Sequence, residues 1–381
     1  MLKLPIYLDN NATTPVDPEV LQSMLPYFTE HFGNAASRNH SFGWVAEEAV
    51  TQAREQVAQL VHADPSEIVF TSGATEAINL ALKGAYEMYS AKGNHIITCL
   101  TEHKAVLDTC KHLEKSGAEV TYLPVNSDGT VDLNLLKMAI RPNTILISIM
   151  MANNETGVLQ PVKAIGAIAK EHNIIFFTDA TQATGKIPVD VQSDNIDMLC
   201  LSAHKIYGPK GAGALYVRRK NPRVRLAAQI DGGGHEKGMR SGTLNVPGIV
   251  ALGKCAALCM QKMNEESKRI SGLRDQLEKN LMQLSNINVN GNTTHRLPNV
   301  TNLSFAGIPG DRLLTEISRT IAVSSGSACT SANPEPSHVL KAMGVAGDLA
   351  KSSIRFGLGR FTTREEIEYA IATVKKIVAN L

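Results

Sequence analysis

Short apolar runs alternate with amphipathic segments through the first two thirds of the chain. Seven β-branched or apolar runs predict strands, at Glu67–Thr71, His95–Leu100, Glu119–Pro124, Thr144–Met150, Ile174–Asp179, Met198–Ser202 and Gly213–Val217. Segments with helical periodicity separate many of them, at Thr75–Tyr89, Lys104–Ser116, Leu133–Ile140 and Val162–Glu171. Continuously apolar strands joined through helices are typical of a mostly parallel sheet covered on both faces. The pattern predicts an α/β fold built on a seven-stranded sheet.

The pattern changes after about residue 255. A long amphipathic helix is predicted at Cys259–Leu284, with large apolar side chains on one stripe. Three candidate strands and a final helix follow, at Asn299–Phe305, Thr320–Ser324, Ser353–Gly357 and Arg364–Ala379. This second region predicts a smaller α+β domain.

Composition and charge narrow the class of protein. The 381 residues are 43% hydrophobic and 19% charged, which is an ordinary globular mixture. Lys and Arg total 38 against 36 Asp and Glu, so bulk charge does not favour direct nucleic-acid binding. No apolar run approaches the roughly 18 residues of a membrane span, and the N-terminal residues lack a basic-then-apolar secretory pattern. We therefore expect a soluble cytoplasmic protein with no membrane partner.

The six cysteines fall into two groups. Five lie in apolar or helical contexts and are expected to be reduced, buried thiols: Cys99, Cys110, Cys200, Cys255 and Cys259. Cys255 and Cys259 have a spacing that could provide two of the ligands of a metal site, but no second Cys or His pair has zinc spacing. A position on the buried stripe of a helix is therefore the simpler interpretation. Cys329 differs, because Ser324–Ser337 is rich in small and polar residues that leave little to pack.

Two charged residues lie at consecutive strand ends. Lys205 follows the strand that ends at Ser202, at the carboxyl edge where open α/β sheets bind ligands. Asp179 ends an apolar strand, where an unpaired carboxylate would be costly. Each has an ordinary alternative, a solvated loop lysine and a helix N-cap. Together they fit the lysine that carries pyridoxal phosphate (PLP) and the acid that pairs with its ring nitrogen.

Three further polar segments follow strand ends. Phe70–Ala77 is a strand, a glycine turn and a helix start, which suits a phosphate but equally a plain turn capped by Thr75. His103 is a candidate to stack on a cofactor ring and carry protons, or a structural hydrogen-bonding group. Met151–Gly157 is the third, and it is also compatible with a simple turn. The convergence of all these segments on one sheet edge favours a binding site.

Several segments match a known family in order along nearly the whole chain. They are Tyr7–Pro15, Thr71–Glu76, Thr101–His103, Asn153–Gly157, Asp179–Gln182 and Ser202–Lys205. These segments resemble those of cysteine desulfurases, which are fold-type I PLP enzymes of the class V aminotransferase superfamily. Two more, Gly232–Thr243 and Ser324–Ser331, resemble the NifS/IscS branch of that family.

The resemblance implies a role for individual residues. Lys205 would hold PLP, Asp179 would pair with the ring nitrogen, Gln182 would bind the phenolic oxygen and His103 would stack on the ring. The phosphate ligands it implies are Ala74, Thr75, Ser202 and His204, with Thr243 reaching the phosphate of a neighbouring subunit in a homodimer. Asn154, which is also placed beside the cofactor, and Arg355 would hold the substrate carboxylate, which suits the planar guanidinium.

The same resemblance implies the reaction. Catalysis by Lys205, His103 and Cys329 would remove sulfur from L-cysteine, leaving L-alanine and a persulfide on Cys329. The sulfur would supply iron–sulfur cluster assembly and tRNA thiolation through a scaffold protein or another acceptor, and Cys329 is a candidate ligand of a cluster shared with that scaffold. The alternatives are a selenocysteine lyase, another class V aminotransferase-like enzyme, or a non-catalytic assembly platform. We expect a large domain at 15–256 and a small one from 1–14 and 257–381 that carries the Cys329 loop.

Overall fold

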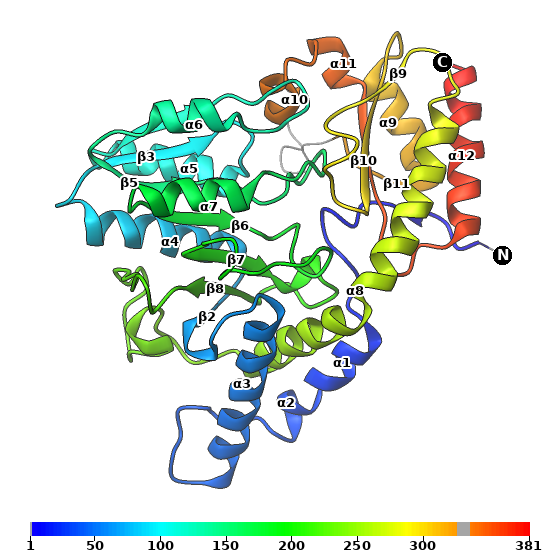
Figure 1. Cartoon of the computed structure of the whole chain (residues 1–381). Coiled ribbons are helices and arrows are strands. Elements are labelled where there is room, and N and C mark those ends of the chain that lie inside the picture. The colour runs from blue at the N-terminus through cyan, green and yellow to red at the C-terminus, as the bar shows by residue number, and fades with distance from the viewer. Residues whose placement is uncertain (1, 326–335) are drawn as a thin grey trace.

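The apolar runs of the first two thirds form one seven-stranded sheet in the computed structural model, which describes residues 2–325 and 336–381 (Figure 1). Its spatial order is β2-β8-β7-β6-β5-β3-β4. The strands are β2 Ile68–Thr71, β3 His95–Cys99, β4 Glu119–Leu123, β5 Thr144–Ser148, β6 Ile175–Asp179, β7 Met198–Ser202 and β8 Gly213–Val217. Strand β8 is antiparallel to β2 and β7, and the other neighbouring pairs are parallel. The predicted mostly parallel sheet is confirmed.

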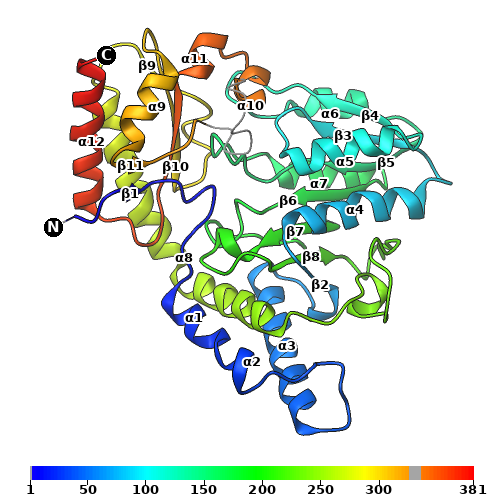
Figure 2. The same cartoon turned by 180° about the vertical axis from the view of Figure 1, so that it is seen from behind.

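Helices cover both faces of this sheet. Helices α4 Ala74–Tyr89 and α5 Lys104–Glu114 lie over one face and stand in front of it in Figure 2. The other face packs against α3 Ser41–Leu60, α6 Leu133–Ala139, α7 Val162–Glu171 and the first half of α8 Val246–Leu281. Neighbouring residues Phe176 and Phe177 of β6 are both fully buried, one in each of these two cores. Burying such a side chain contributes about 1.5–3 kcal/mol, which explains why the central strands are apolar without interruption.

The last third builds a separate layer beside the sheet. An antiparallel sheet of order β12-β10-β9 joins β12 Ser353–Gly357, β10 Val300–Phe305 and β9 Ile287–Val289. Its core also takes apolar side chains from α9 Gly310–Ser318, α12 Arg364–Ala379 and the second half of α8. The N-terminal strand β1 Ile6–Tyr7 pairs with β11 Ile321–Ala322, so the two ends of the chain share this layer. The division at 15–256 stays a prediction.

Helix α8 corrects the sequence prediction. It begins at Val246, not Cys259, and ends at Leu281. Its first half is buried on nearly every side, so it lacks the polar stripe from which a surface helix is predicted. Gly253 lies so close to α3 that an added Cβ would stand 2.6 Å from the Cα of Ala53. Cys255 and Cys259 are both buried in this half, which confirms the core-stripe interpretation.

Short helices complete the described chain: α1 Pro18–Met24, α2 Pro26–Thr29, α10 His338–Ala342 and α11 Gly347–Lys351, with 3-10 turns at Pro65–Glu67, Ala203–Lys205 and Glu236–Gly238. Among residues 2–325 and 336–381, no helix combines the length and the apolar character needed to cross a membrane.

Candidate active site

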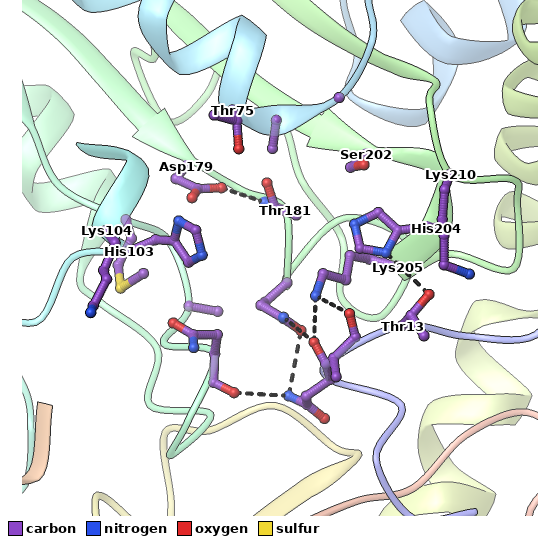
Figure 3. Close-up of a pocket in the computed structure, with 18 of the residues that line it drawn as sticks. Thr13, Thr75, His103, Lys104, Asp179, Thr181, Ser202, His204, Lys205 and Lys210 are labelled. Carbon is purple, nitrogen blue, oxygen red and sulfur yellow. Dashed lines mark hydrogen bonds between the residues drawn. The ribbon is translucent and has the colours of Figure 1, made fainter. Parts of the chain in front are cut away.

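A cavity of about 560 Å³ opens at the carboxyl ends of the central strands, between the large sheet and the C-terminal layer (Figure 3). Of the predicted site residues that the structure describes, all except Thr243 line it: Ala74, Thr75, His103, Asn154, Asp179, Gln182, Ser202, His204, Lys205 and Arg355. Parallel strands bring their carboxyl ends to a single edge, which is why segments so far apart in sequence meet here. The predicted convergence is confirmed as geometry, and the role of each residue stays a prediction.

Lys205 ends the 3-10 turn that follows β7. Its Nζ donates to the backbone carbonyls of Asn11 and Ala12, at 2.5 and 2.7 Å. A lysine with two carbonyl acceptors in a cavity is not the solvated loop lysine of the alternative interpretation. Beside it, burial and the Lys205 charge lower the pKa of His204 to about 4, so this imidazole is neutral at pH 7. Neutral His204 lies with Nδ1 3.2 Å from Thr13 Oγ1.

Asp179 is the last residue of β6, and the residue is only 6% exposed. Its Oδ1 accepts hydrogen bonds from the Thr181 amide at 2.9 Å and from the Cys200 thiol at 3.3 Å. The carboxylate therefore stabilises a turn, and the helix N-cap alternative is wrong. The same turn carries Gln182, whose Nε2 donates to the Asn11 carbonyl at 2.9 Å and whose Oε1 accepts from Asn11 Nδ2 at 3.4 Å.

The start of helix α4 forms the opposite end of the cavity. Gly73 is its N-cap at φ 151°, and no side chain caps the helix. Thr75 is the second helical residue, so the alternative that it caps a plain turn is wrong. An uncapped N-terminus of a 16-residue helix carries partial positive charge and N–H donors, which suit a phosphate. Ser202 adds a hydroxyl on the facing strand end, and Figure 3 shows it across from Thr75.

His103 has the structural hydrogen-bonding role and also lies in the cavity wall, while its contact with a cofactor ring stays a prediction. Its Nδ1 accepts the Ala105 amide at 3.1 Å, so the imidazole caps helix α5 while it lines the cavity. Burial lowers the pKa of His103, and the nearby carboxylate of Asp179 opposes that shift. With Nδ1 fixed as an acceptor, the neutral ring carries its proton on Nε2.

Arg355, on strand β12, is 2% exposed and closes the cavity on the side of the C-terminal layer. Its Nη1 donates to the Asn154 carbonyl at 3.0 Å, and its Nη2 forms an ion pair with Asp9 Oδ1 at 2.7 Å. The two residues predicted to hold a substrate carboxylate are therefore in direct contact. Asp9 was assigned no role from the sequence.

Sequence reasoning missed other residues of the cavity wall. They are Asn11, Ala12, Thr13, Lys104, Glu155, Thr181, Lys210 and His338, among others. The first three belong to Tyr7–Pro15, a segment used for the resemblance but given no role. No sequence pattern marks His338 as a site residue. Its Nε2 lies 3.0 Å from the Glu102 carbonyl, and the residues flanking His338 in the sequence do not predict this contact with a distant segment.

One predicted residue lies away from the cavity, and another lies outside the described residues. Thr243 is exposed and lies outside its lining. Cys329, with its predicted persulfide and cluster-ligand roles, lies outside the described residues. Within the described ranges, no group of three His, Cys, Asp or Glu side chains could hold a metal ion.

Comparison with known proteins decides the family. The model of the family described as "Aminotransferase class-V" matches residues 6–370. The chain belongs to this family. Among its relatives is "Cysteine desulfurase IscS" from Anaeromyxobacter dehalogenans (strain 2CP-C), 59% identical over 97% of this chain and 91% of the relative. The protein of that name from Dechloromonas aromatica (strain RCB) is 57% identical over 100% of this chain and 94% of its own.

Solved structures agree with the family and the fold. A structure titled "NIFS-LIKE PROTEIN" superimposes with a TM-score of 0.93 at 39% identity, over 99% of this chain and 100% of that one. Another, "SspA in complex with cysteine", has a TM-score of 0.83 at 40% identity, over 94% and 100% of the two chains. The resemblance to the NifS/IscS branch and the PLP fold type I are thereby confirmed.

Class V aminotransferases depend on PLP, and the donor set of this cavity fits that cofactor. An uncapped helix start and the Ser202 hydroxyl suit its phosphate, while Asp179 suits a protonated ring nitrogen and Lys205 suits its aldehyde. The phosphate end also has little spare room, since a Cβ added to Gly213 of β8 would stand 2.6 Å from Gly73 Cα. The chain is therefore expected to bind PLP in this cavity.

Proposed function

We propose that this chain is a cysteine desulfurase that converts L-cysteine to L-alanine and leaves the sulfur as a persulfide on Cys329. The observation that carries the proposal is the meeting of Lys205, Asp179 and Arg355 in one cavity. These side chains provide an amine for PLP, a carboxylate for its ring nitrogen and a guanidinium for a substrate carboxylate. The 59% identity to a protein named cysteine desulfurase supports the same reaction.

Bound PLP would supply an electron sink for the substrate carbons. Around it, Lys205 would act as tether and then as proton carrier, with the carbonyls of Asn11 and Ala12 stabilising its ammonium form. Asp179 would keep a proton on the ring nitrogen. His103, whose pKa burial lowers, would stack on the cofactor ring and present the N–H of Nε2 as a hydrogen-bond donor, since its Nδ1 already accepts from the Ala105 amide.

The sulfur-transfer step we propose balances within the chain and the substrate. The Cys329 thiolate attacks the sulfur of L-cysteine, so an S–S bond forms and the substrate C–S bond breaks. The electron pair of the C–S bond stays on carbon, which takes up a proton to give L-alanine. No external oxidant is needed, because the substrate carbon is reduced as its sulfur becomes the outer sulfur of the persulfide.

We propose a homodimer with shared sites. Large apolar side chains are exposed on α2, at the start of α3 and on the segments that flank α2, where Leu25, Phe28, Phe32, Phe42 and Trp44 are each more than half exposed. The rings of Phe32 and Phe42 lie 5.3 Å apart. Exposed aromatic surface of this kind is typical of a protein interface, and a second copy is the occupant we propose. Exposed Thr243 would reach the phosphate of that copy.

The sulfur acceptor we propose is an iron–sulfur scaffold protein or a tRNA-thiolation protein. We propose the cytoplasm as the location, since a persulfide carrier needs a reducing compartment. The five cysteines of the described part are all free thiols, which agrees with that environment.

The test measures sulfide and alanine released from L-cysteine by the PLP-loaded enzyme with a reducing thiol. Equal amounts of both products are expected, with none from Lys205→Ala and an unchanged yield from Lys170→Ala, an exposed lysine on α7 outside the cavity. Release from L-selenocysteine alone would indicate a selenocysteine lyase, and amino transfer to a keto acid would indicate an aminotransferase. Either result would overturn the proposal.

A further inference from the structure

The segment Tyr7–Pro15 contributes an ion pair to the wall of the cavity. Asp9 Oδ1 lies 2.7 Å from Nη2 of Arg355, with the two side chains 16% and 2% exposed. A guanidinium this deeply buried requires a compensating anion, because an unpaired buried charge is strongly destabilising. Asp9 supplies it from a different end of the chain.

The backbone holds Asp9 in register with Arg355. The Leu8 amide donates to the Ala322 carbonyl at 2.9 Å, and the Gly357 amide donates to the Leu8 carbonyl at 2.7 Å. The Asn10 amide donates in turn to the Gly357 carbonyl at 3.0 Å. With both neighbours of Asp9 bonded to Gly357, two residues beyond Arg355, the carboxylate has little freedom to move away from the guanidinium.

The hydrogen bonds of Arg355 leave room for a ligand. A guanidinium has five N–H donors. Asp9 takes one through Nη2, and the Asn154 carbonyl takes one through Nη1. Nε is buried without a partner among the described residues, and each Nη group keeps a second N–H. The group is therefore fixed by two neighbours while donors remain for an incoming carboxylate.

We propose that Asp9 is a positioning residue that fixes the Arg355 guanidinium for the carboxylate of an amino-acid substrate. The inference rests on the proposed function, in which Arg355 takes that carboxylate. Without Asp9, the long arginine side chain would sample other rotamers, and each substrate would have to order it on binding. Asp9 thus raises the affinity for amino acids that carry a free carboxylate over those that do not.

The test compares two non-sulfur ligands of the PLP-loaded enzyme, L-alanine and L-alaninamide, through the absorption change of the cofactor. The amide lacks the carboxylate charge and is otherwise close in shape. Asp9→Ala is expected to raise the Kd of L-alanine about 10-fold, the effect of losing one charged hydrogen bond. The Kd of L-alaninamide is expected to stay within about twofold, because it gains little from an ordered Arg355.

Two further variants separate positioning from general damage. Asp9→Asn keeps an oxygen that can accept from Nη2, and it should recover most of the preference for L-alanine. Asp17→Ala is the matched control: Asp17 pairs with Arg360 at 2.8 Å, both are buried, and neither lines the cavity. It should lower stability but leave the ratio of the two Kd values unchanged.

Several results would overturn the inference. An unchanged ratio in Asp9→Ala, or tighter L-alanine binding, would mean that Asp9 does not position Arg355 for a carboxylate. If Asp9→Ala does not load PLP, Asp9→Glu keeps the charge but shifts the guanidinium by a methylene, and an unchanged ratio there would have the same meaning. Failure of the proposed function is distinguishable, since it appears as absent sulfide release in the wild type while the binding ratio is still measurable.

Discussion

Ser337 is expected to hold the start of helix α10 against the cavity, and Ser337→Ala tests this. Its Oγ accepts hydrogen bonds from the amides of Val339 and Leu340, at 3.1 and 3.2 Å. The same hydroxyl donates to Oε2 of Glu155. Both side chains are buried, and burial raises the pKa of the Glu155 carboxyl. One substitution therefore removes a helix cap and leaves a buried carboxyl oxygen without its donor.

The magnitude follows from these two losses. An N-cap contributes about 1 kcal/mol, and an unsatisfied buried polar group costs about 1–3 kcal/mol. The sum is about 2–4 kcal/mol, and each 1.4 kcal/mol is a factor of ten in an equilibrium constant. Hydrogen exchange of the Val339 and Leu340 amides through local opening should therefore accelerate about 30- to 1000-fold in Ser337→Ala.

The control is Thr363→Ala, at the start of α12. Thr363 forms a capping box with Glu366, but it is exposed and serves no buried carboxyl group. Its loss should accelerate exchange in the first turn of α12 about fivefold, as expected for a cap of about 1 kcal/mol. Equal effects of Ser337→Ala and Thr363→Ala would refute the reasoning, because the contact with Glu155 would then contribute nothing.

Three further predictions concern the cofactor and acid sensitivity. Lys205→Ala should lose the covalent linkage to the cofactor. After borohydride treatment, gel filtration should remove PLP from this variant, whereas the wild-type protein should retain PLP covalently. Gly213→Ala should weaken PLP binding at least about 10-fold, since its Cβ would press on Gly73, and a fluorescence titration measures this. Burial lowers the pKa of His95 to about 4, so the unfolded chain takes up this proton first as pH falls. Stability should therefore decline between about pH 6.5 and 4, and chemical denaturation should show a shallower decline for His95→Gln.

The sequence predicted the large sheet well because its strands are buried on both faces. Such strands read as continuous apolar runs, and β7 and β8 begin and end where predicted. The first half of α8 was not predicted, because a helix that is buried on all sides shows no periodic polar stripe. The local sequence pattern thus predicts a helix when one of its faces is exposed, and it predicts a buried strand from a short continuous apolar run.

The sequence predicted the site as a set of strand ends. The site residues that it did not predict are held in place by contacts between distant segments. Asp9 follows a strand of only two residues, and its pairing with Arg355 crosses almost the whole chain. No periodicity encodes such a contact. His103 shows a second limit: the same imidazole caps a helix and lines the cavity, so its structural role does not exclude the predicted contact with a cofactor.

The most direct test of the central claim is the mass of the peptide that contains Cys329 after a single turnover with L-cysteine. We predict one added sulfur atom on Cys329, with one L-alanine formed per added sulfur. Cys329→Ser should form no L-alanine while it keeps the absorption of bound PLP. Sulfur found on another cysteine, or L-alanine formed by Cys329→Ser at the wild-type rate, would contradict the account.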